Sequence, residues 1–102
     1  MPTPRVTHHA VDRAVQRLHI RRALAPRYLE DITNESIAVP RRIMAALLRK
    51  PIPPRRKGAE KYRCFGSIVL VIRGNALVTV WKLGEEALAE LLLWIAWRLP
   101  PG

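Results

Sequence analysis

The chain has almost no cysteine and no long hydrophobic run. Cys64 is the only cysteine among 102 residues, so no internal disulfide can form and no Cys/His spacing suits a metal site. We therefore expect a reduced, cytoplasmic protein without metal or cofactor, with Cys64 buried in a strand. The most apolar stretch covers residues 87–99. Its 13 residues, which include Glu90, are too few to span a bilayer as a helix.

The beginning of the chain also lacks an apolar run. Pro2, Pro4 and Arg5 interrupt it, so we expect no signal peptide.

Acidic residues are scarce. The chain holds 18 Lys and Arg against 8 Asp and Glu, a net charge of +10. Residues 1–57 carry 13 basic and 4 acidic residues, a net charge of +9, whereas residues 58–102 carry 5 and 4, a net charge of +1. A basic half on a small domain is typical of proteins that bind phosphate backbones. The charge therefore favours RNA or another polyanion as partner, with a merely basic soluble protein as the alternative.

Several common catalytic motifs are missing. The sequence has no Gly-rich phosphate loop, no Ser-His-Asp spacing and no pair of carboxylates in an apolar setting. It does have His9 and Arg13, which share one face of an expected helix. Imidazole transfers protons near neutral pH, and guanidinium binds phosphate and stabilises its developing charge. Together they suit metal-free RNA transesterification, in which the ribose 2′-hydroxyl attacks; a solvated surface histidine is the alternative.

The hydrophobic pattern changes from helical to strand-like along the chain. Thr7 is a good N-cap, and Pro26 and Pro40 separate further helices, so residues 6–50 are expected to be helical. Residues 51–58 form a basic, proline-rich loop, 60–82 a β-meander and 85–99 a last helix. We predict one α+β domain over residues 1–102, with N-terminal helices packed on a three- to four-stranded antiparallel meander sheet and a C-terminal helix.

The last two strands form a predicted hairpin. Gly74 and Asn75 suit a two-residue turn that pairs Arg73 with Ala76. The same register pairs Leu70 with Thr79 and Ile68 with Trp81. One face would then carry Ile68, Leu70, Ile72, Leu77 and Trp81, with Thr79 as its only polar residue.

Two further surfaces are candidates for binding. Basic positions expected to contact nucleic acid are Arg41, Arg42, Arg63 and, in the loop, Arg55, Arg56 and Lys57. The last helix is apolar on most sides, more than a domain of this size can enclose. Its expected partner surface, for a second copy of the chain or an inhibitor protein, consists of Leu91, Leu92, Trp94, Ile95 and Trp97.

The segment HAVDRAVQRLHI resembles the H-A-x-x-R-x-x-x-R-x-x-I opening of RelE-like small toxins, matching at His9, Arg13 and Arg17. VTVW, residues 78–81, is similar to the aliphatic-Thr-Val-aromatic strand that ends their meander. These prokaryotic proteins belong to the barnase–EndoU–colicin–RelE superfamily of metal-independent RNases. The resemblance implies that His9 is the acid–base residue, that Arg13 and Arg17 bind phosphate, that Thr79 lines the cleft, and that an antitoxin is a partner.

Two functions follow from these expectations. The first is an RNase-type toxin, or a protein derived from one, that cleaves RNA by acid–base transesterification. The alternative is a non-catalytic regulator of phage or plasmid type, which uses the same fold to bind nucleic acid or a host protein. Both functions include binding, but only the first predicts that RNA is cleaved.

Overall fold

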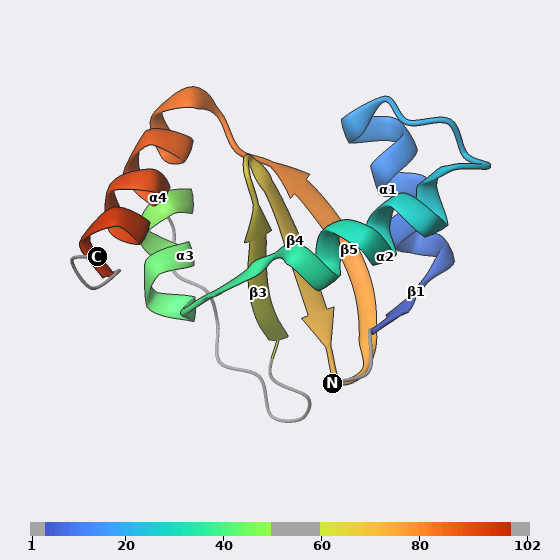
Figure 1. The fold of residues 1–102 in the computed structure, drawn as a ribbon, viewed down its shortest axis with the longest axis horizontal. Helices are drawn as coiled ribbons and strands as arrows, with labels where there is room; N and C mark the ends of the chain where they lie inside the picture. The colour runs from blue at the N-terminus through green and yellow to red at the C-terminus, as the bar shows by residue number, and fades with distance from the viewer. Residues whose placement is uncertain (1–3, 50–59, 99–102) are drawn as a thin grey trace.

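The computed structural model describes residues 4–49 and 60–98 as three layers, with a sheet between two pairs of helices (Figure 1). The elements are β1 (Arg5–Val6), α1 (His8–Leu18), α2 (Ala25–Glu35), β2 (Ile37–Val39), α3 (Arg41–Leu48), β3 (Glu60–Phe65), β4 (Ile68–Arg73), β5 (Ala76–Lys82) and α4 (Glu85–Arg98). The predicted α+β class is confirmed. The loop predicted at 51–58 and the end of the last helix at Leu99 lie outside the described residues.

The sheet is larger than predicted. Its strand order is β1-β5-β4-β3-β2; β1 runs parallel to β5, and the other neighbours are antiparallel. The predicted meander forms the centre, but a short strand extends each edge, so the prediction of an antiparallel sheet of three or four strands was incomplete. The strand β2 falls within the segment 6–50 that was expected to be helical, and β1 ends at the first residue of that segment. The strands β1 and β2 are two and three residues long, which is too short to show the two-residue periodicity of a strand.

The end of α2 shows why the helical pattern stops. Ser36 Oγ donates a hydrogen bond to the carbonyl of Thr33 at 2.6 Å, and Arg63 Nε donates to Ser36 Oγ at 2.7 Å. These bonds satisfy polar groups at the helix terminus. The following residues Ile37–Val39 pair with β3. Two of these three residues are β-branched, which suits a strand.

Each face of the sheet covers its own hydrophobic core. The core beneath α1 and α2 consists of Ala10, Val11, Ala14, Ala25, Leu29, Ile32, Leu70, Ile72, Leu77 and Val80. The core on the α3 and α4 side consists of Val39, Met44, Leu47, Tyr62, Cys64, Val69, Val71, Leu83 and Leu91. Cys64 is buried as predicted, and desolvation raises its pKa to about 11. The thiol therefore stays protonated at neutral pH.

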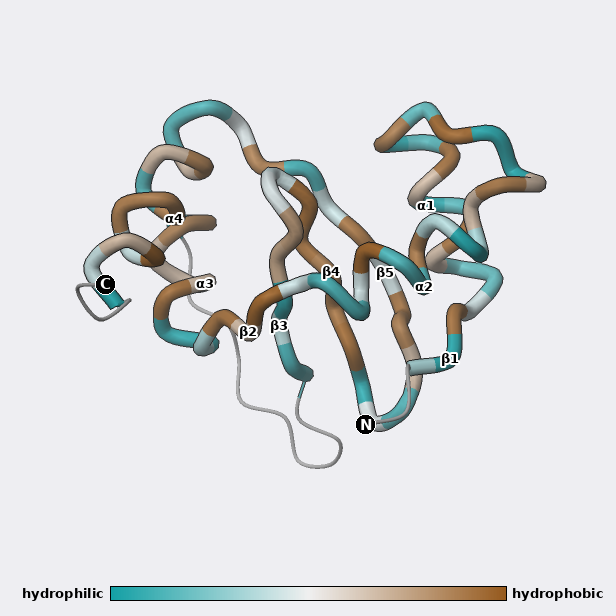
Figure 2. The backbone as a smooth tube through the Cα atoms, viewed as in Figure 1, coloured by the Kyte–Doolittle hydropathy of each residue, from teal (hydrophilic) through white to brown (hydrophobic). Residues whose placement is uncertain are grey.

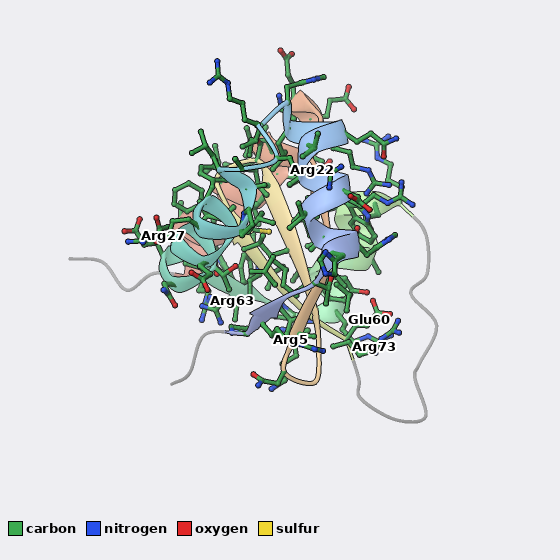
Figure 3. All side chains as sticks on the ribbon, turned by 90° about the vertical axis from the view of Figure 1, so that its right-hand side faces the viewer. Arg5, Arg22, Arg27, Glu60, Arg63 and Arg73 are labelled. Atoms are coloured by element: carbon green, nitrogen blue, oxygen red, sulfur yellow. The ribbon has the colours of Figure 1, made fainter. Side chains whose placement is uncertain are left out.

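An ion pair supports the pairing of β3 with β4. Glu60 lies opposite Arg73 in the register, and Arg73 Nη2 is 2.8 Å from Glu60 Oε1 (Figure 3). Tyr62 Oη donates to the other carboxylate oxygen of Glu60 at 3.2 Å. The buried carboxylate is thus both paired and hydrogen-bonded, as burial of a charge requires.

The register predicted for the β4–β5 hairpin is correct at the turn and wrong beyond it. Arg73 pairs with Ala76 as expected, but Val71 rather than Leu70 faces Thr79, and the register shifts between Val71 and Ile72. A β-bulge places one extra residue, Val78, in β5. Because a shift of one residue moves a side chain to the other face, the rest of β5 is inverted relative to the prediction.

The bulge divides the face predicted for the hairpin. Ile68, Leu70, Ile72 and Leu77 lie on the α1 and α2 side as one group, but Trp81 packs on the α3 and α4 side. Thr79 pairs with Val71, which belongs to the core on the α3 and α4 side, so Thr79 also lies on that face. Val80 instead contributes to the core beneath α1 and α2, where the prediction had placed Thr79 and Trp81.

The last helix, α4, is apolar along much of its length (Figure 2), but few of its side chains are buried. Leu91 is its one buried residue, at 1% exposure, and Trp94 and Ile95 pack partly against the core. Leu92, Leu93 and Trp97 are exposed. The assignment of Leu91 to a partner surface was therefore wrong, because it belongs to the core. Within the described ranges no helix is long and apolar enough to cross a membrane.

Replacing Leu91 with alanine tests this assignment. Leu91→Ala leaves a cavity in the second core, and we expect the free energy of unfolding to fall by about 2–5 kcal/mol. Leu93→Ala removes the same atoms from a side chain that is 71% exposed, so it should change stability by less than about 0.5 kcal/mol. Urea denaturation of both variants measures the difference. Equal effects would contradict the packing of α4 on the sheet.

Candidate nucleic-acid interface

Helix α1 separates an apolar face from a polar one. Thr7 caps it, since its Oγ1 accepts a hydrogen bond from the Ala10 N–H at 3.1 Å, which confirms the predicted start. Ala10, Val11 and Ala14 are buried against the sheet. The opposite face carries His9 and Arg13, so the sequence pattern placed both residues correctly on the solvent side.

His9 and Arg13 are in direct contact on this face. Arg13 Nε donates to His9 Nε2 at 3.4 Å, and Arg13 Nη1 donates to Gln16 Oε1 at 2.9 Å. The spacing of four residues brings the histidine and the arginine together one helical turn apart. Because His9 Nε2 accepts this bond, its lone pair points at Arg13, and the imidazole and the guanidinium lie side by side on the exposed face of the helix. This arrangement can bind an anion, and His9 can accept a proton when Arg13 releases Nε2.

Arg22 joins this surface from the turn that follows α1, a position that sequence reasoning missed. Its Nη1 lies 2.6 Å from Asp12 Oδ1, and Arg22 projects from the exposed side of α1 and its turn (Figure 3). The hydrogen bond from Arg22 lowers the pKa of the Asp12 carboxyl below its usual range. Asp12 holds Arg22 beside the helix; the two residues lie ten positions apart across a turn, so no spacing within one helix signals the contact.

These residues line a shallow hollow. It has a volume of about 460 Å³, and its lining consists of His9, Asp12, Arg13, Val15, Gln16 and Arg22. Two arginines outweigh the single carboxylate, so the hollow is positive. We call this group the α1 site. Because the hollow is shallow, it suits a phosphate group of an extended backbone better than a small substrate that needs an enclosed cleft.

Arg17 and Thr79 are not part of the α1 site. Arg17 Nη1 donates to the carbonyl of Val80 at 2.8 Å, along the part of β5 that β1 does not pair with. Thr79 lies on the far face of the sheet. The structure thus brings together two of the four residues that the resemblance implied, His9 and Arg13, and places the other two elsewhere.

The remaining basic positions are dispersed. Arg63 donates to Ser36 Oγ and to the Ser36 carbonyl, so it connects β3 to the end of α2. Arg41 and Arg42 begin α3, on the opposite side of the sheet from α1. Arg55, Arg56 and Lys57 lie outside the described residues. In residues 4–49 and 60–98, no group of three or more His, Cys, Asp and Glu side chains is arranged to hold a metal ion.

Comparisons of the chain with protein families, curated proteins and solved structures find no match.

The contact of Arg17 with β5 predicts a structural role. Arg17→Ala leaves the Val80 carbonyl without this charged donor, and we expect the free energy of unfolding to fall by about 1–3 kcal/mol. Arg21→Ala removes the same charge from an exposed position nearby and should have little effect on stability. Thermal or urea denaturation compares the two variants. A stable Arg17→Ala protein with weakened RNA binding would instead place Arg17 in the binding surface.

Proposed function

We propose that this protein binds RNA through the α1 site. Arg13 and Arg22, beside His9, hold the phosphate backbone of the RNA. The observation that carries the proposal is the contact between Arg13 and His9 on the exposed face of α1, next to the ion pair of Arg22 with Asp12. Guanidinium groups suit phosphate because they keep their charge and offer several donors in one plane. The net charge of +10 adds long-range attraction for a polyanion.

The α1 site favours binding over cleavage. Transesterification needs a base for the 2′-hydroxyl and an acid for the leaving 5′-oxygen. Among the residues that line the hollow, His9 can serve as the base. Asp12 cannot serve as the acid, because an exposed aspartate is already ionised at neutral pH and its ion pair with Arg22 lowers its pKa further. Thr79, which the resemblance places in the cleft, lies on the other face of the sheet.

The binding proposal predicts a specific loss in Arg13→Ala. Removing one phosphate contact should weaken binding of all RNA sequences alike and reduce the slope of log Kd against log salt concentration by about 0.7–0.9. Fluorescence anisotropy of a labelled RNA, measured over a series of salt concentrations, gives both quantities. Lys61→Ala, which removes an exposed charge from β3, is the control. An equal slope for both variants would contradict the assignment of Arg13.

RNA cleavage is the second candidate function, and the position of His9 directly beside Arg13 favours it. Once Arg13 turns from His9 Nε2 to a bound phosphate, that nitrogen is free to take the 2′-hydroxyl proton while Arg13 stabilises the charge on the phosphorane oxygens. The leaving oxygen would then take its proton from water. This RelE-like chemistry would produce 2′,3′-cyclic phosphate ends.

A cleavage assay with total RNA and EDTA tests the second candidate. If His9 is the base, wild type yields cyclic phosphate ends, His9→Ala loses the activity by at least about 100-fold, and His8→Ala retains it. His8 is the matched control, since it is also exposed on α1 but does not line the hollow. Absence of cleavage by folded wild type, with Arg13-dependent binding intact, would leave the regulator as the function.

A further inference from the structure

A second hollow is lined by residues of β2, the start of α3 and the end of α4. The helices α3 and α4 lie at the end of the molecule away from α1 (Figure 1). The volume of the hollow is about 600 Å³, and its lining consists of Ala38, Val39, Pro40, Arg42, Trp94, Trp97 and Arg98. None of these residues is acidic. We call it the tryptophan hollow.

Trp97 is the unusual residue here. Its side chain is 86% exposed, whereas soluble proteins usually cover such a large aromatic surface at least in part. Trp94, one turn earlier, is only partly buried. Two indole rings therefore border one open hollow.

The arginines of the tryptophan hollow give it a positive rim. The Arg98 guanidinium carbon lies 5.2 Å from the centre of the Trp94 ring, and Arg98 Nη1 donates to the Ala38 carbonyl at 3.4 Å. These two contacts hold Arg98 along the ring and at the outer edge of β2. Arg42 is exposed on the opposite wall.

The start of α3 adds to the positive potential. Pro40 provides no side-chain cap, and the first turn contains two arginines and no acidic residue. Because a helix N-terminus carries partial positive charge, this arrangement favours an anion beside Arg42. The hollow therefore combines exposed aromatic rings with cations that are not neutralised by acidic neighbours in its lining.

The other hollows do not share this combination. The α1 site has arginines without an aromatic ring, and the hollow between α3 and the start of α4 is bordered by Glu85, Glu86 and Glu90. A flat apolar ring beside a fixed cation matches one ligand chemistry above others, namely an unpaired nucleobase with its flanking phosphate. A base can stack on the exposed indole while the phosphate meets guanidinium.

We propose that the tryptophan hollow is a stacking site for single-stranded RNA, in which Trp97 stacks on a base and Arg42 and Arg98 hold the adjacent phosphates. The identification of the strand as RNA rests on the function proposed for the α1 site. The stacking site itself uses different residues, from α3 and α4, at the opposite end of the sheet. It predicts that the protein prefers unpaired over double-stranded RNA, because a duplex does not expose its base faces.

The test compares an unstructured RNA of about 8 nucleotides, within the range of single-strand binding sites, with the duplex formed from it and its complement. Wild type should bind the single strand more tightly, and binding should quench tryptophan fluorescence. Trp97→Ala should weaken single-strand binding roughly 5- to 150-fold, as expected for loss of one stacked base. Trp97→Phe, which keeps a ring, should restore most of the affinity.

Leu93→Ala is the matched control, since it removes exposed apolar surface from the same helix without lining the hollow. It should leave RNA affinity unchanged. Single-strand binding that is equal in wild type and Trp97→Ala overturns the proposal. So does a loss of self-association in Trp97→Ala, measured by light scattering without RNA, because Trp97 would then cover a second copy of the chain.

Arg13→Ala separates this proposal from the function of the α1 site. If Arg13→Ala weakens binding and Trp97→Ala does not, RNA binding stands and the stacking site is wrong. If Trp97→Ala alone weakens binding, the stacking site stands and the α1 site is wrong. A single-stranded DNA of the same sequence shows whether the 2′-hydroxyl contributes, and equal affinity would assign the hollow to single strands of either kind.

Discussion

Burial of β4 on both faces is the constraint on which the rest of the structure depends. Val69, Leu70, Val71 and Ile72 are each at most 5% exposed, although they point alternately to opposite sides of the sheet. A strand that is apolar on both faces needs a covering layer on each side. The helices α1 and α2 provide one layer, and α3 and α4 provide the other. The two candidate binding sites lie on the outer surfaces of these layers, which explains why they are far apart.

The position of the α1 site follows directly from this packing. Ala10, Val11 and Ala14 bring α1 close to β5, so the polar face of the helix points away from the sheet. The basic residues are therefore fixed by a rigid element rather than by a loop. The tryptophan hollow arises differently. Leu91 anchors α4 to the second core, and the last turns of the helix lie beside the edge strand β2 with their aromatic residues incompletely covered.

Sequence reasoning succeeded where the signal was local or periodic. The Thr7 cap, the turn at Gly74 and Asn75, and the polar face with His9 and Arg13 all follow from spacing within one turn or one hairpin. The edge strands β1 and β2 could not be predicted, because two or three residues carry too little pattern and are held by distant partners. Arg22 was missed for a similar reason. Its carboxylate partner lies ten positions earlier, across a turn.

The sequence by itself determined the α+β class, the amphipathic first helix, the basic charge and the apolar character of the last helix, since each depends on residue type and short-range order. The tertiary structure decided which of these features meet. A single bulged residue, Val78, turns Thr79 to the face opposite the α1 site. Arg17 contacts β5, and Leu91 enters the core while Trp97 stays outside. These side-chain positions depend on packing between elements far apart in the chain, and a local sequence pattern carries no information about such packing.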